Sequence, residues 1–205
     1  MATPSDEERN IRRLLNDRID FKLYSAEQHL KRLKEIENAY GDIAKYSARI
    51  EVEMEVDCFL SQLVGAVDSL LFQINDKLDL AIPSDQVNFA NVQSALNAKT
   101  KIIDLLSPLD KARQEGMWYF ILSDMRNQLF QGTFLRKVFS VNDSLQKPSQ
   151  VRSLYPKREF QKDKPSDHDM YMDVIRHLEK SMDQVRELIF TIRSGQPLLE
   201  QEEQF

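Results

Sequence analysis

Apolar residues recur at helical spacing along most of the chain, and short turn-like stretches separate the segments that carry them. The longest uninterrupted pattern runs from residue 42 to about residue 78 and contains no proline. Its apolar stripe recurs about every 3.6 residues and consists of Val56, Phe59, Leu60, Leu63, Val64, Val67, Leu70, Leu71, Ile74 and Leu78. A helix with so broad an apolar face is expected at the centre of the fold, covered by other helices.

Two helices are predicted before this central one. Ser5 with Glu8 resembles a capping box, in which two side chains satisfy free backbone groups, and it starts a narrowly amphipathic helix on the surface. Ser25 with Gln28 starts a second helix in the same way. Gly41 is placed to end that helix, because glycine adopts the left-handed conformation common at helix ends.

Two further helices are predicted between the central helix and residue 132. Ser84 or Asp85 is available as the N-cap of a helix that reaches about residue 106. Ser107 and Pro108 suit the cap and first position of the next helix, where proline loses no helical hydrogen bond. That helix is expected to end near Gly132.

The stretch from residue 140 to residue 167 is rich in turn residues and has no apolar period. Residues 126 to 164 contain nine basic and three acidic side chains, although the whole chain has a net charge of −5. Any polyanion that binds is therefore expected at this segment, but a merely solvated basic loop is the favoured interpretation and nucleic-acid contact is the alternative. The residues expected to contact nucleic acid are Arg136, Lys137, Arg152, Lys157 and Arg158. A last amphipathic helix follows, capped by Ser166 or Asp167 and ended by Gly195.

The composition is that of one globular domain: 205 residues, of which 41% are hydrophobic and 30% charged. The predicted fold class is all-α, a bundle of about five to seven helices with long antiparallel helices as its core. Residues 1–41 are expected to pack as N-terminal helices on a bundle formed by residues 42–194. Residues 195–205 are expected to form a peripheral acidic tail.

The sequence contains few signs of catalysis. It has no glycine-rich phosphate loop, no nucleophile elbow and no zinc-binding HExxH motif, so no catalytic residue, metal site or cofactor is predicted. Cys58 is the single cysteine, which excludes an intramolecular disulfide, and its neighbours suggest a buried, inert thiol. The N-terminus does not resemble a signal peptide, and no apolar run approaches the length of about eighteen residues typical of a membrane span. A cytoplasmic protein without a membrane segment is predicted.

A polar cluster interrupts the apolar helix at residues 115–134, where Arg126, Asn127 and Gln131 lie on or beside the apolar stripe. Arginine stays charged in proteins, so one that turns inward needs a carboxylate, a phosphate or water. Asp68 lies on the border of the central stripe and is the expected protein partner of Arg126.

Two other groups of residues are assigned to packing. Small residues recur in the central helix at positions where another helix backbone could approach closely, namely Cys58, Ser61, Gly65 and Ser69. The consecutive aromatic residues Trp118, Tyr119 and Phe120 are interpreted as core, since base stacking needs exposed rings.

The segment from Arg126 to Gln131, RNQLFQ, resembles the R-N-x-x-x-H form of the motif of HEPN (higher eukaryotes and prokaryotes nucleotide-binding) domains. The resemblance implies an all-α bundle that binds RNA or a nucleotide through Arg126 and Asn127, with Asp68 beside them. It also implies a homodimer, because HEPN sites usually form at a dimer interface.

Gln131 stands where active HEPN ribonucleases have a histidine. Glutamine can hydrogen-bond a phosphate or a base but does not titrate near neutral pH, so it cannot act as a general acid or base. The resemblance therefore implies a binding protein that is catalytically weak or inactive; if it is an enzyme, it would be a metal-independent ribonuclease. The alternative from the residues themselves is a structural or protein-interaction bundle, in which Arg126 pairs with Asp68 and no nucleic acid binds.

Overall fold

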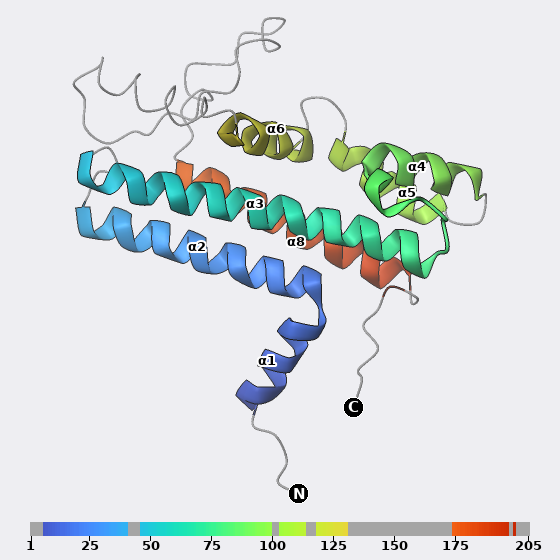
Figure 1. Cartoon of the computed structure of the whole chain (residues 1–205), viewed down its shortest axis with the longest axis horizontal. Helices are drawn as coiled ribbons and strands as arrows, with labels where there is room; N and C mark the ends of the chain where they lie inside the picture. The colour runs from blue at the N-terminus through green and yellow to red at the C-terminus, as the bar shows by residue number, and fades with distance from the viewer. Residues whose placement is uncertain are drawn as a thin grey trace, which may run out of the picture.

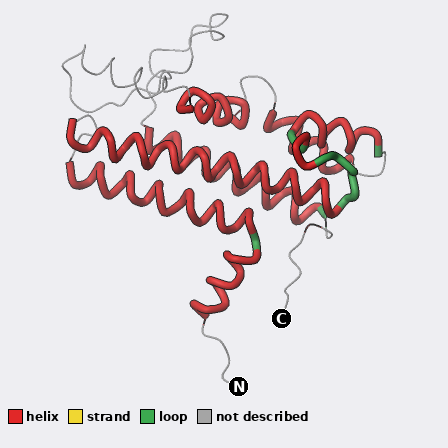
Figure 2. The backbone as a smooth tube through the Cα atoms, viewed as in Figure 1, coloured by secondary structure: helices red, strands yellow, loops and turns green. Residues whose placement is uncertain are grey.

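A computed structural model describes residues 6–40, 46–99, 103–113, 118–130, 174–196 and 199 of the chain. These residues form α-helices joined by turns, with no strand among them, which confirms the predicted all-α class (Figure 2). The helices are α1 (Asp6–Asn16), α2 (Arg18–Tyr40), α3 (Tyr46–Lys77), α4 (Phe89–Ala98), α5 (Ile103–Arg113), α6 (Trp118–Phe130) and α8 (Val174–Gly195). A 3-10 turn, η1 (Ser84–Gln86), precedes α4.

The long helices α2 and α3 lie side by side and form the main axis of the bundle (Figure 1). They are antiparallel, because Lys22 of α2 lies against Gly65 of α3, whereas His29, further along α2, contacts Glu55, earlier in α3. Helix α8 packs against both, while α6 lies along α3 and the pair α4 and α5 packs near its C-terminal end. Helix α1 projects from the body and contacts α2.

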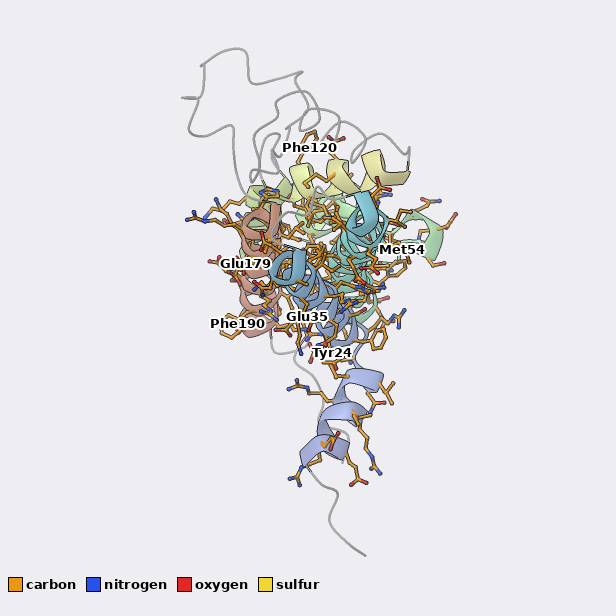
Figure 3. All side chains as sticks on the ribbon, turned by 90° about the vertical axis from the view of Figure 1, so that its left-hand side faces the viewer. Tyr24, Glu35, Met54, Phe120, Glu179 and Phe190 are labelled. Carbon is orange, nitrogen blue, oxygen red and sulfur yellow. The ribbon has the colours of Figure 1, made fainter. Side chains whose placement is uncertain are left out.

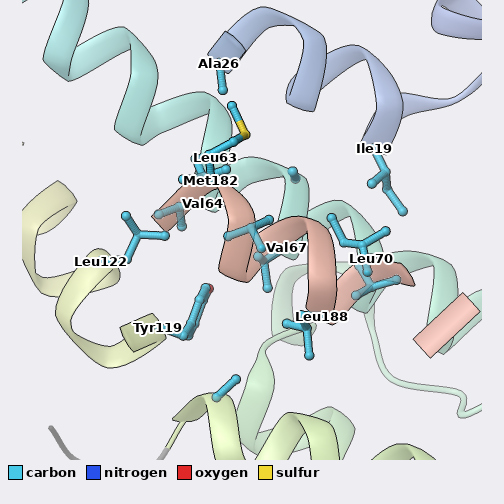
Figure 4. Packing of buried hydrophobic residues seen from close by; sticks show 14 of the residues in the cluster. Ile19, Ala26, Leu63, Val64, Val67, Leu70, Tyr119, Leu122, Met182 and Leu188 are labelled. Atoms are coloured by element: carbon cyan, nitrogen blue, oxygen red, sulfur yellow. The ribbon is translucent and has the colours of Figure 1, made fainter. Parts of the chain in front are cut away.

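The hydrophobic core is centred on α3, as the apolar stripe predicted (Figure 4). Phe59, Leu63 and Leu70 of this helix are fully buried, and they are covered by apolar residues of α2, α6 and α8. Burial of a leucine or phenylalanine side chain stabilises the folded state by roughly 1.5–3 kcal/mol. The core therefore fixes the position of α6 relative to α3.

Several helix starts differ from the prediction. Helix α2 begins at Arg18 and not at Ser25, because the Asp17 carboxylate accepts the backbone N–H groups of Ile19 at 2.8 Å and Asp20 at 3.1 Å. Ser25 is an ordinary interior residue of that helix.

The region around α4 and α5 shows two similar differences. The N-cap of α4 is Asn88 and not Ser84 or Asp85, since the Asn88 side chain accepts the backbone N–H of Asn91 at 3.0 Å. Pro108 lies inside α5 and does not begin a helix. Its neighbours Leu105 and Leu109 are buried, so packing holds the helix together at the proline.

Two expectations about exposure are also wrong. Cys58 is exposed, not buried. Its thiol pKa is nevertheless raised, by partial burial and then by the carboxylates of Asp57 and Glu55, which keeps the thiol protonated and poorly nucleophilic. The tail is not wholly peripheral, because Leu199 is fully buried and its carbonyl accepts a hydrogen bond from the Gln73 side chain at 3.5 Å.

The sequence analysis predicted no membrane span, but one helix, α3, meets the length and hydropathy criteria for such a span. The part from Ile50 to Lys77 is long and apolar enough to cross a membrane by length and composition alone. Half of its most apolar window is buried inside the bundle, and the core helix of a soluble protein meets the same criterion.

Candidate functional site

The polar residues Asp68 and Arg126 meet where α6 lies along α3. The Arg126 Nη1 atom is 3.5 Å from the Asp68 Oδ2 atom, so the expected pairing is present but long. The other terminal nitrogen of Arg126, Nη2, donates to the Asn127 Oδ1 atom at 3.3 Å. The sequence thus correctly indicated both the pair and its neighbour.

Tyr119 completes the contact on the core side. Its ring is buried and packs on the ring of Phe89, with centroids 4.5 Å apart, and its hydroxyl donates a hydrogen bond to the Asp68 carboxylate. Burial, and then the Asp68 charge, raises the pKa of the tyrosine far above its ordinary value, so Tyr119 remains a proton donor. Tyr119 therefore holds the Asp68 carboxylate on the side that faces the core, while the other side of the carboxylate faces solvent.

The Asp68 carboxyl is a half-buried group with a perturbed proton affinity. Burial raises its pKa above the ordinary carboxyl value, and this effect exceeds the lowering by Arg126, by Lys22 and by its hydrogen bonds. Its side chain is still 47% exposed, whereas that of Arg126 is 28% exposed. Neither group is sealed inside the bundle.

Arg126 is not fully used by the protein groups around it. Its Nε atom is buried and has no hydrogen-bond partner in the structure. Its contact with Asp68 lies at the outer limit for a hydrogen bond. Because the side chain is also 28% exposed, the guanidinium is partly open to solvent and only loosely engaged, so it can accept an anion from outside.

The adjoining helix α2 contributes two more cations. Lys22 lies directly over Gly65, where a Cβ atom would be 2.6 Å from its Nζ atom. Burial, and then the neighbouring Arg18, lowers the pKa of Lys22, while Asp68 partly opposes this shift. Arg126 and Lys22 flank the Asp68 carboxylate, and Arg18 lies close enough to Lys22 to affect its pKa. We name Arg18, Lys22, Asp68, Tyr119 and Arg126 the Asp68 cluster.

The small residue at position 65 has a different role from the expected one. It accommodates the Lys22 side chain and not the backbone of another helix. The sequence analysis missed Lys22 and Arg18, although Lys22 and Gly65 lie about equally far from the connection at residues 41–45. In a hairpin of two antiparallel helices, residues equally far from the connection lie side by side, so this spacing could have indicated that Lys22 lies next to Gly65.

Several predicted site residues lie outside the described residues. These are Gln131 and the five expected nucleic-acid contacts, Arg136, Lys137, Arg152, Lys157 and Arg158. Among the residues that the structure describes, no group of histidine, cysteine and acidic side chains is arranged to hold a metal ion. His29 instead bonds the Glu55 carboxylate at 2.7 Å, and His177 is buried in α8.

The aromatic residues of α6 divide between core and surface. Tyr119 is buried and Trp118 is partly buried against the core, as interpreted from the sequence. Phe120 is exposed instead, and Figure 3 shows it on the outer side of α6. Consecutive helical residues point about 100° apart, so the three rings cannot all face the same neighbour.

Comparison with protein-family models, curated proteins and solved structures found no match to this chain. The fold and the site place the protein in a broad class, the all-α bundles, with a cluster of cations at its surface. They do not assign it to a family. The similarity to HEPN domains remains a hypothesis that rests on the motif at Arg126.

Proposed function

We propose that the protein binds RNA or a nucleotide at the Asp68 cluster. The observation that carries the proposal is the state of Arg126, whose guanidinium is partly exposed and held by one long contact to a carboxylate. A phosphate group offers shorter, bidentate hydrogen bonds to such a guanidinium. Asn127 is expected to add a contact, and Gln131 an accessory one.

The local charge favours an anion even though the whole protein is acidic. Two cations, Arg126 and Lys22, act on Asp68, and a third, Arg18, lies beside Lys22. In the sequence, residues 126 to 164 also contain nine basic and three acidic side chains, which favours a polyanion as the ligand. Phosphate contacts of this kind predict binding that weakens steeply as salt rises.

The test is a filter-binding titration of RNA and of nucleotides at several salt concentrations. Arg126→Ala is expected to weaken binding markedly and to reduce its salt dependence. Arg186→Ala is the matched control, because Arg186 is also an arginine paired with a carboxylate, Glu27, at 3.1 Å, but on α8 and α2. Equal and negligible binding by wild type and Arg126→Ala would end the proposal.

Catalysis is a separate question from binding. With Gln131 at the position of the motif histidine, a general acid or base would have to come from another residue. An enzyme that lacks a general acid or base is typically slower by about 10²–10⁴-fold. A metal-independent ribonuclease would cleave RNA in the presence of a chelator and lose that activity in Arg126→Ala. Without such cleavage, the protein is a binding protein.

The second candidate function is protein interaction, and a different observation favours it. Helix α1 projects from the bundle (Figure 1). Its apolar residues Ile11 and Leu15 are exposed. A hollow of about 330 Å³, partly lined by Leu14 and Tyr24, lies beside it. Four of the seven residues that line the hollow are charged, Arg13, Asp20, Glu27 and Arg186, so the uncovered apolar surface consists of Ile11 and Leu15 on α1.

A second copy of the chain is the partner that this surface fits. The sequence of α1 is acidic in its first turn and basic in the rest, so two antiparallel copies would place opposite charges together along the Ile11 and Leu15 seam. This gives a homodimer, as the motif resemblance also implies. Light scattering at micromolar concentration is expected to show a dimer that Leu15→Glu dissociates, and a monomeric wild type would contradict it.

A further inference from the structure

Phe72 is an exposed aromatic residue on the most apolar helix of the bundle. Its side chain is 45% exposed, although its neighbours Leu70, Leu71 and Ile74 are fully buried. It follows Asp68 by four residues in α3, so the two side chains lie on the same face, about one helical turn apart. The exposed ring therefore adjoins the Asp68 cluster.

Helix α2 brings a cation to the same place. Lys22 lies against Gly65, and α2 is antiparallel to α3, so Arg18 lies level with the turn of α3 between Asp68 and Phe72. Arg18 already contacts an aromatic face, since its guanidinium lies 4.9 Å from the ring centroid of Phe21. The surface next to Asp68 thus combines cations with an accessible ring.

We propose that Phe72 stacks on a base of the ligand whose phosphate is held by Arg126 and Lys22. The inference rests on the proposed function and narrows its ligand class to nucleotides and single-stranded RNA. A base in a duplex has both faces covered by its neighbours, whereas a base in a single strand can stack on a side chain. The Asp68–Arg126 pair lies about one helical turn from the Phe72 ring, and Lys22 lies about two turns from it along α3, so cations and a ring are available for the two chemically different parts of a nucleotide.

The other exposed phenylalanines fit this role less well. Phe120 follows the buried Tyr119 directly and so points away from the side of α6 that contacts Asp68. Phe190 is 70% exposed on α8, and Figure 3 shows it on a different side of the bundle from Phe120. Phe190 therefore serves as a matched control, an exposed ring on a different side of the bundle.

The experiment compares two labelled probes, a decamer of uridine ribonucleotides and an abasic decamer with the same sugar-phosphate backbone. Wild type is expected to bind the uridine decamer about tenfold more tightly than the abasic one. Phe72→Leu and Phe72→Ala, which remove the ring from a half-exposed site, are expected to abolish this difference. Phe72→Tyr, which keeps a ring, and Phe190→Ala are expected to retain it.

Failure of this inference differs from failure of the proposed function. Equal binding of both probes by wild type, or an unchanged preference in Phe72→Leu, overturns the stacking role while leaving the phosphate site intact. If Arg126→Ala binds both probes as wild type does, or if wild type binds neither probe, the proposed phosphate site is refuted. Thermal melting of each variant verifies folding, and Phe72→Leu retains an apolar side chain should Phe72→Ala fail to fold.

Discussion

Replacing Asp68 by asparagine is expected to strengthen the binding of RNA or a nucleotide. The carboxylate lies 3.5 Å from Arg126 and competes with any phosphate for that guanidinium. Asparagine has nearly the same shape, and its carbonyl oxygen can still accept the hydrogen bond that Tyr119 donates to Asp68. The substitution therefore removes a negative charge with little change in packing.

The size of the effect follows from the geometry. A phosphate on the open side of Arg126 would lie roughly 5 Å from the Asp68 carboxylate, and repulsion there is about 0.8 kcal/mol in water-like surroundings and about 1.7 kcal/mol at half that dielectric constant. The half-exposed position of Asp68 places it within this range. Since about 1.4 kcal/mol is a factor of ten, binding should tighten about four- to fifteenfold.

The assay is fluorescence polarisation with a labelled single-stranded RNA at about 50 mM and about 500 mM salt. The matched control is Glu27→Gln, which removes the same charge from an exposed carboxylate that pairs with Arg186 at 3.1 Å. The gain in Asp68→Asn should shrink at high salt, and Glu27→Gln should show little gain. Unchanged or weaker binding in a folded Asp68→Asn protein would refute the view that Asp68 and the ligand share Arg126.

Three stability predictions follow from other groups. The pKa of Asp68 is raised in the folded protein, so the folded state binds this proton more tightly than the unfolded chain does. Wild type should therefore lose stability relative to Asp68→Asn as pH rises above about 4. Thermal midpoints of the two proteins that differ by a constant amount from pH 4 to 7 would contradict this. His177 has its pKa lowered by burial and then by Lys180, so stability should fall as pH decreases through about 6.5, and His177→Gln should flatten this slope in urea titrations. Arg193 is 15% exposed and lies 2.7 Å from Asp17, so Arg193→Ala should reduce the free energy of unfolding by about 3 kcal/mol, and a loss below about 1 kcal/mol would show that the pair is not structurally important.

Much of the fold follows from local patterns in the sequence. The apolar stripe from Val56 to Leu78 requires a helix with a wide buried face, and α3 is the centre of the core. The partnership of Asp68 with Arg126 also follows from the sequence, because a carboxylate and a guanidinium near a core are each costly to bury alone. These inferences need only one helix, or one pair of charges, at a time.

Helix boundaries were less predictable, because several residues compete for the same role. Asp17 and Ser25 are both good N-caps, and the structure uses Asp17, whose other carboxylate oxygen also pairs with Arg193 of α8. Pro108 is a good first residue, yet burial of the leucines on either side of it keeps it inside α5. Contacts between helices decided both cases.

The sequence by itself determined that the chain is helical, that α3 is central and that Arg126 needs a negative partner. Only the tertiary structure decided that this partner leaves Arg126 partly open, that Lys22 and Arg18 of α2 join the same surface, and that Phe72 is exposed beside it. The physical reason is that periodicity is a property of one helix. What covers each face of that helix depends on the register and packing of its neighbours.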